Sequence, residues 1–295
     1  GNVAASGDYV NYQSSWTAYT GGLIGKNSQS KVDLSQAQGD VSSVFKTKHQ
    51  NGSMGANLYT GGLIGQNQNG QINQVEAVGG VDATITITTN NASGSPNVYT
   101  GGLIGENNAA QISNAIAKGD VSLNSMLTTR DSSYAIGLAT GGLIGKNHAN
   151  STLKDVQALG QVDVVAEINS YRANSQLSVA AGGLIGDNQN SFISNGSSSG
   201  AVRAHVKTGF GVLPVDITVN TDVGGLVGKN TGSNIKQSHA TGHVLANVVS
   251  TSDFIQANVG GLVGSQQSNS ISSGSELMTS KRSFLIAITS SEVAN

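Results

Sequence analysis

The stretch that decides the fold runs from residue 60 to residue 67 and reads Thr-Gly-Gly-Leu-Ile-Gly-Gln-Asn. Its core, Gly-Gly-Leu-(Ile or Val)-Gly, recurs along the whole chain of 295 residues. The Gly-Gly pairs begin at Gly21, Gly61, Gly101, Gly141, Gly182, Gly224 and Gly260. Successive pairs are therefore 40, 40, 40, 41, 42 and 36 residues apart. Self-similarity at such a period is the sequence signature of a solenoid, in which each repeat forms one coil.

Two columns of side chains accompany the glycines. The leucines that follow each Gly-Gly pair are Leu23, Leu63, Leu103, Leu143, Leu184, Leu226 and Leu262. The amides that come two positions after each closing glycine are Asn27, Asn67, Asn107, Asn147, Asn188 and Asn230, with Gln266 in the last copy. Stacked coils place like residues above one another about 4.8 Å apart. The leucines therefore predict a buried ladder, and the amides predict a stack in which each side chain bonds the next.

The rest of each repeat has the alternation of β-strands. Val81, Ala83, Ile85 and Ile87 alternate with polar residues, which is typical of a strand with one buried face. No segment combines helical periodicity with helix caps. The sequence predicts an all-β fold, a parallel β-helix or β-solenoid of about seven coils of about 40 residues each. Right-handed winding is the default expectation.

The solenoid is expected over residues 1–280, with a C-terminal capping strand over 281–295. Gly1-Asn2-Val3 matches the Gly-x-Val step of the repeat, so the chain is expected to open partway through a coil. About 40 residues are more than a compact coil needs, so we expect each coil to carry a variable arm on a stiff rod. The arms are expected at residues 46–57, 88–97, 128–137, 169–177, 207–214 and 249–257.

The composition argues against several classes of function. The net charge is −2, charged residues make up 11%, and no basic patch is visible, so a nucleic-acid partner is not expected. No apolar run approaches the roughly 20 residues of a membrane-spanning helix, so no transmembrane segment is expected. Cysteine is absent, which rules out disulfides and thiol chemistry.

The pattern Gly-Gly-Leu-(Val or Ile)-Gly-x-Asn, followed by an aliphatic residue, a small residue and Gly-x-Val, resembles the GLUG motif. The matching segments are Gly21–Asn27, Gly61–Asn67, Gly101–Asn107, Gly141–Asn147, Gly182–Asn188, Gly224–Asn230 and Gly260–Gln266. The resemblance covers about residues 1–275. It implies a β-helical segment of a large bacterial secreted or surface protein of adhesin type. These are framework positions, so the resemblance transfers no binding or catalytic residue.

A column of aromatic residues is the best candidate for a ligand site. Tyr19, Tyr59 and Tyr99 occupy one position in three successive copies, and Trp16 lies close to the first of them. Alternation predicts that the tyrosines point outward, where sugar rings could dock on an exposed aromatic stack. The alternative is that the stacked rings only stabilise neighbouring strands.

Metal binding and catalysis find little support in the sequence. His239 and His243 are four residues apart, but their strand context removes the helical face that would align them. The column Lys26, Gln66, Glu106, Lys146, Asp187 and Lys229 changes chemistry from copy to copy, which indicates a solvent-exposed edge. No compact acidic or Ser/His/Asp constellation emerges. We expect no metal, no cofactor and no enzyme activity.

The leading hypothesis is a non-catalytic structural and adhesive segment, secreted or on a bacterial cell surface. Its arms would meet glycans, host cells or sibling cells. An alternative is an extracellular filament subunit, in which copies of the chain stack head to tail by strand addition. Less favoured are a carbohydrate-active enzyme and an ice-binding protein, the latter suggested by the row Thr84, Thr86 and Thr88.

Overall fold

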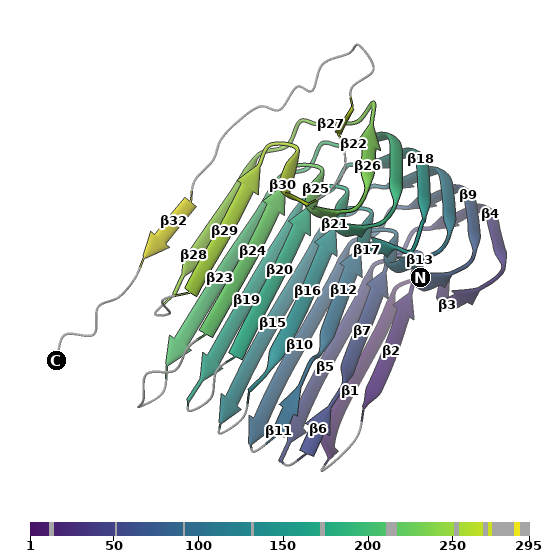
Figure 1. The fold of residues 1–295 in the computed structure, drawn as a ribbon. Helices are drawn as coiled ribbons and strands as arrows, with labels where there is room; N and C mark the ends of the chain where they lie inside the picture. Colours follow the sequence, from purple (N-terminus) through teal and green to yellow (C-terminus); the bar gives the residue numbers. More distant parts are fainter. Residues whose placement is uncertain are drawn as a thin grey trace.

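The fold is known from a computed structural model. It describes residues 1–11, 15–50, 52–90, 92–130, 133–171, 175–210, 217–250, 254–267, 271–272 and 286–289. These residues form β-strands that pair in parallel, and the described part of the chain contains no helix. The strands build a β-solenoid, which confirms the predicted fold class (Figure 1).

Four long sheets run along the solenoid, and successive coils add their strands side by side to each of them. Sheet A contains β1 (Val3–Asn11), β5 (Val41–His49), β10 (Val81–Asn90), β15 (Val121–Arg130), β19 (Val162–Ser170), β23 (Val202–Phe210), β28 (Val244–Val249) and β32 (Ile286–Thr289). Sheet B contains β2 (Trp16–Gly21), β7 (Ala56–Gly61), β12 (Asn97–Gly101), β16 (Ala135–Gly141), β20 (Ser175–Gly182), β24 (Ile217–Gly224) and β29 (Phe254–Gly260).

The strands of the other two long sheets have at most seven residues. Sheet C contains β3 (Ile24–Ser28), β8 (Ile64–Gln68), β13 (Ile104–Asn108), β17 (Ile144–His148), β21 (Ile185–Gln189), β25 (Val227–Thr231) and β30 (Val263–Gln267). Sheet D contains β4 (Lys31–Ala37), β9 (Gln71–Ala77), β14 (Gln111–Ala117), β18 (Thr152–Ala158), β22 (Phe192–Ser198), β26 (Asn234–Lys236), β27 (His239–Ala240) and β31 (Ile271–Ser272). A further two-stranded sheet pairs β6 (Gly52–Met54) with β11 (Ala92–Gly94).

Two separate apolar cores divide each coil into two regions. We call the region of sheets A and B the arm and the region of sheets C and D the head; this arm is not one of the variable display arms predicted from the sequence. In the arm, sheets A and B pack face to face, with Ile85 and Ile87 on one side and Leu58 and Val98 on the other. In the head, sheets C and D enclose the second core, to which the leucine ladder belongs. Figure 1 shows the long strands of the arm and the short, curved strands of the head.

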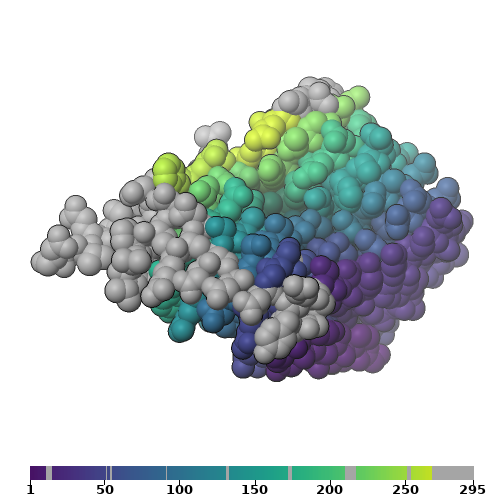
Figure 2. Space-filling view, turned by 60° about the horizontal axis from the view of Figure 1, so that its bottom comes forward, coloured from purple at the N-terminus to yellow at the C-terminus, as the bar shows by residue number. Residues whose placement is uncertain are grey.

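The body is a slab rather than the expected rod. Strands of sheet A reach 10 residues, so the arm is about 33 Å long at about 3.3 Å per residue. Seven stacked strands of sheet B span only about 29 Å at about 4.8 Å per step. Figure 2 shows the coils following one another in sequence order, from purple to yellow.

The two ladders that the repeat predicts are present. Leu63, Leu103, Leu143, Leu184 and Leu226 are fully buried in the head, whereas Leu23 in the first coil is 52% exposed. Leu262 packs against the same core in the last coil and is partly buried. In the amide column, each Asn donates from Nδ2 to Oδ1 of the next coil over 2.8 Å, from Asn27 through to Asn230. Asn230 donates in turn to Gln266 Oε1 at 2.8 Å.

Glycine is required at the Gly-Gly step because backbones of adjacent coils meet there. A Cβ on Gly62 would overlap the carbonyl oxygen of Gly102 in the next coil. A Cβ on Gly61 would overlap the carbonyl oxygen of Ile64 in the same coil. The chain can therefore turn sharply from sheet B into sheet C only where side chains are missing.

One feature of the first six coils lies outside the sequence predictions. Along sheet D each of these coils has one residue with positive φ, with values between 45° and 60°: Leu34, Gln74, Asn114, Asp155, Asn195 and Gln237. Positive φ bends the strand, so sheet D wraps around the head core. Asn and Asp tolerate this conformation better than other residues with side chains, and a column rich in them was the available signal.

The segments predicted as display arms are largely ordered strand. Residues 46–49, 52–54 and 56–57, for example, lie in β5, β6 and β7. Other parts of the predicted arms, residues 51, 91, 131–132, 172–174, 211–214 and 251–253, lie outside the described residues.

At the two ends of the chain, single strands extend sheet A. Val3 pairs with Val41, so the first strand continues the register of the repeat. Of the predicted capping strand, only Ile286–Thr289 is described, and it pairs in parallel with β28. Among the described residues, no helix has the length and apolar character needed to cross a membrane.

Candidate functional site on the outer face of sheet B

Sheet B has one face on the arm core and one face turned away from it. The outward positions form three columns across the coils. The tip column is Ser15, Gly55, Ser95, Ala135, Gln176, Thr218 and Phe254; the middle column is Thr17, Asn57, Asn97, Gly137, Ser178, Asn220 and Gln256. The corner column, beside sheet C, is Tyr19, Tyr59, Tyr99, Ala139, Ala180, Asp222 and Asn258. The outer face of sheet B therefore changes chemistry both across and along the solenoid.

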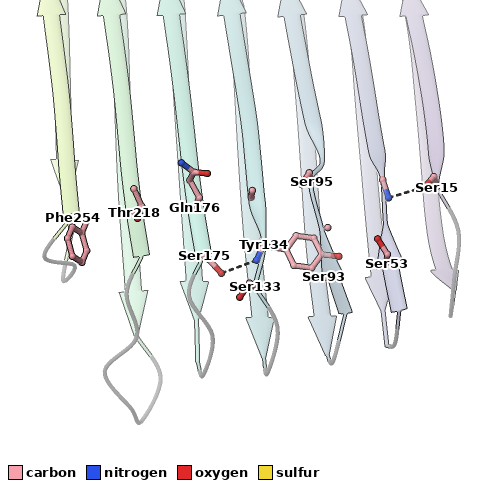
Figure 3. A pocket seen from close by; sticks show the side chains of 13 residues that line it. Ser15, Ser53, Ser93, Ser95, Ser133, Tyr134, Ser175, Gln176, Thr218 and Phe254 are labelled. Atoms are coloured by element: carbon pink, nitrogen blue, oxygen red, sulfur yellow. Dashed lines mark hydrogen bonds between the residues drawn. The ribbon is translucent and has the colours of Figure 1, made fainter.

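A trough of about 960 Å³ runs along the tip column, across all the strands of sheet B (Figure 3). Its lining consists mainly of serine, glycine and other small residues, including the exposed side chains of Ser93, Ser95 and Ser133. The trough exists because bulky side chains are missing from most of the tip column. At the C-terminal end, Phe254 is 56% exposed and presents an aromatic ring.

Tyr134 is the largest side chain of the trough lining and is 2% exposed. Figure 3 shows its ring reaching sideways toward the neighbouring strand that carries Ser93 and Ser95. Its hydroxyl is buried and has no hydrogen-bond partner among the residues that the structure describes. Burial raises the pKa of Tyr134 to about 12, so this group stays protonated near neutral pH and can donate a hydrogen bond.

The tyrosine column forms a stack, but its predicted exposure is wrong. Neighbouring rings lie 5.4 Å apart between centroids, from Tyr19 to Tyr59 and from Tyr59 to Tyr99. Tyr59 is only 9% exposed and Tyr99 only 8%. The rings fill the corner where sheet C folds back against sheet B, and Lys146 Nζ lies 5.1 Å from the Tyr99 ring centroid. Burial raises the pKa of both tyrosines.

Trp16 belongs to a different cluster from the tyrosines. It stacks on Tyr9 and Phe45, with ring centroids 5.1 and 5.3 Å apart, and packs against the arm core. In the strand it lies an odd number of residues from Tyr19, so the two side chains point to opposite faces of sheet B. The structure therefore does not bring the four predicted aromatic residues into one surface.

The charged column of sheet C is solvent-exposed only at Lys26; Gln66, Lys146, Asp187 and Lys229 are half-buried and Glu106 is buried, so the predicted solvent-exposed edge is wrong for most of the column. Glu106 is 7% exposed. Its Oε1 lies 3.1 Å from His148 Nε2, and its Oε2 accepts a hydrogen bond from Gln66 Nε2 at 2.6 Å. Burial alone raises the pKa of Glu106, but its hydrogen bonds with His148 and Gln66 outweigh that effect and leave the pKa below its usual value. The carboxylate therefore remains charged and ties three coils together.

The corner also contains a small polar pocket in the last three coils, which we call the corner pocket. It has a volume of about 250 Å³, and Asn220, Asp222, Lys229, Gln256 and Asn258 are among its lining residues. Asn258 Nδ2 donates to Asp222 Oδ1 at 2.7 Å. Burial raises the pKa of Asp222, against the effects of this hydrogen bond and of the positive charge of Lys229.

The described residues include no group of three or more His, Asp or Glu side chains that could hold a metal ion. His239 and His243, the histidine pair singled out in the sequence, lie on β27 and just before β28.

Sequence reasoning missed both hollows of the outer face. The recurrence of Ser53, Ser93 and Ser133 at 40-residue steps was a usable signal for the trough. Nothing comparable marks Asp222, which is the single acidic residue in its column.

Comparison with known protein families identifies the GLUG motif in the chain. The model of the GLUG motif matches residues 219–245, which span β24 to the start of β28 in the sixth coil. No curated protein matches the chain, and no solved structure does so either. The motif is thus found in one coil, and the other coils share its framework positions at the same places in the sheets.

Proposed function

Because the chain carries a GLUG motif and repeats its framework coil after coil, we propose that it is a non-catalytic adhesive scaffold. It would belong to a bacterial secreted or cell-surface protein and bind extended glycans along the trough of sheet B. The observation that carries the proposal is the trough itself, a continuous hollow of about 960 Å³ lined by hydroxyl-bearing and small side chains. The extracellular location rests on the resemblance to GLUG-containing surface proteins.

Geometry favours an extended polymer as the ligand. The trough offers one position per coil, so its lining repeats at the strand spacing of about 4.8 Å. This spacing is close to the length that one sugar residue adds to an extended linear glycan. Seven positions span about 29 Å, which suits an oligosaccharide better than a single sugar.

The chemistry of the lining fits the same ligand. Serine and threonine hydroxyls both donate and accept hydrogen bonds, as sugar hydroxyls do. The exposed ring of Phe254 offers an apolar face to the C–H side of a sugar ring at one end of the trough. Among the described residues, none that lines the trough carries a charged side chain, which favours a neutral glycan.

The test is binding to a panel of immobilised linear polysaccharides, followed by titration with oligosaccharides of increasing length. Affinity is expected to rise until the oligosaccharide spans the trough, and then to level off. Ala135→Trp fills the floor of the trough and is expected to weaken binding about tenfold or more. Asn124→Trp, on the exposed outer face of sheet A in the same coil, is the matched control. Equal binding by both variants, or no binding by the native chain to any polymer, would overturn the proposal.

A further inference from the structure

The corner between sheets B and C is filled at one end of the solenoid and hollow at the other. In the first three coils the corner column contains Tyr19, Tyr59 and Tyr99, whose rings pack against one another. In the next two coils it contains alanine, and in the last two Asp222 and Asn258. The same place in the coil therefore turns from an aromatic stack into a polar cavity.

The polar groups of the corner pocket are already arranged. Asp222 is 7% exposed, and the hydrogen bond from Asn258 fixes one of its carboxylate oxygens. Among the described residues, the other oxygen, Oδ2, makes no hydrogen bond in the structure. The carboxylate can accept a hydrogen bond from one ligand hydroxyl, and the planar amide beside it can donate a hydrogen bond to the next hydroxyl. Asn220 and Gln256 add two more amides, and Lys229 adds an ammonium group.

Size and charge narrow the class of ligand. The volume of about 250 Å³ lies just below the roughly 300–1,000 Å³ of pockets for drug-sized molecules, so one ring fits and two do not. A ligand anion would meet Asp222, and a ligand cation would meet Lys229. An apolar ligand would leave the lining carboxylate and amides without partners, which is costly. A neutral ring with several hydroxyl groups satisfies them all.

We infer that the corner pocket binds a single neutral hexose residue, with Asp222, Asn258 and Gln256 as hydrogen-bonding partners of its hydroxyls. This site is separate from the trough and does not depend on glycan binding there. Of the residues that the structure describes, Gln176 alone lines both hollows.

The experiment is a titration of the full chain with glucose, galactose and mannose, followed by saturation-transfer NMR and calorimetry. At least one of these sugars is expected to bind. Asp222→Tyr gives the sixth coil the residue that the first three coils have there, and so fills the pocket in a way the fold already accommodates. We expect this variant to lose detectable binding. His205→Tyr, on the exposed outer face of sheet A, is the matched control and is expected to bind like the native chain.

A second variant keeps the test valid if Asp222→Tyr does not fold. Gln256 is exposed and lines the pocket, so Gln256→Ala removes one hydrogen-bonding partner without disturbing the core. It is expected to weaken binding about fivefold to tenfold. The inference is overturned if none of the three sugars binds, or if Gln256→Ala and a folded Asp222→Tyr both bind like the native chain. Trough binding is measured separately with polymers and Ala135→Trp, so the two proposals can fail independently.

Discussion

The head and the arm of each coil solve the same packing problem in different ways. In the head, a column repeats one residue: leucine above leucine and asparagine above asparagine. In the arm, a single column of sheet A holds Phe45, Ile85, Ser125, Ala166 and Val206. Both regions bury their inward side chains almost completely. The arm also has one column of identical residues, in which Val41, Val81, Val121, Val162, Val202 and Val244 stack. Burial alone therefore does not explain why some columns repeat one residue and others do not.

The difference lies in which chemical groups make the contacts. In the head, backbones of successive coils meet at the glycines, and each asparagine bonds its own counterpart at 2.8 Å. The glycine contact excludes any side chain, and the ladder contact requires a side-chain amide, which is Gln266 in the last coil. In the arm, side chains of sheet A meet side chains of sheet B, where a large residue can face a small one as long as the space is filled. Identity is thus required where backbone or self-complementary groups make the contact, and only volume is required elsewhere.

The largest effect is expected from a methyl group added to the head backbone. In Gly102→Ala the new Cβ would overlap the carbonyl oxygen of Gly142 and crowd Ala117. We expect a loss of about 4 kcal/mol or more in the free energy of unfolding, measured by urea denaturation. Gly80→Ala is the control, because the nearest atom to its Cβ would be 3.6 Å away, and it should change stability by less than about 1 kcal/mol. Similar losses in both variants would contradict the comparison.

A smaller effect is expected from breaking the amide ladder. Asn107→Ala leaves a donor on Asn67 and an acceptor on Asn147 unpaired in the buried head, and should cost about 3 kcal/mol. The arm provides the matched test. Asn97 donates to Asn57 over 3.1 Å on the half-buried outer face, so Asn97→Ala should cost only about 0.5–1 kcal/mol. Thermal and urea unfolding of the two variants measure the contrast, and equal costs would show that the ladder is not special.

The smallest effect concerns the junction of head and arm. Asp187 lies on sheet C, and its buried Oδ1 has no hydrogen-bond partner within the described part of the chain. Burial raises the pKa of Asp187, against the attraction of Lys146 and Lys229. The folded state therefore binds the proton more tightly than the unfolded state. As the pH rises from the unfolded value of about 3.9 through the higher folded pKa, the free energy of unfolding must fall.

Asp187→Asn removes this pH dependence. The variant should be more stable than the native chain at pH 7, and the difference should vanish below about pH 4. Urea denaturation at several pH values measures it, with Asp82→Asn on the exposed outer face of sheet A as the control. A pH-independent difference, or a less stable variant at pH 7, would argue against the burial of this charge.

Much of the fold could be predicted because the solenoid puts like residues together. The leucines and asparagines that recur once per repeat in the sequence are direct neighbours in adjacent coils of the structure. The candidate site was less predictable. Alternation identified the outward face of the strand that carries Tyr59 and Tyr99, but not that sheet C covers that face. The corner pocket was not predicted, because it depends on the absence of tyrosine from the corner column in the last coils.

By itself, the sequence determined the number of coils, the parallel register and the residues of the head, because contacts between identical neighbours leave a periodic signature. Only the tertiary structure decided that the outer face of sheet B is closed by tyrosines at one end and open at the other. Those surfaces arise where two different sheets meet. Contacts between unlike positions of the repeat leave no period in the chain.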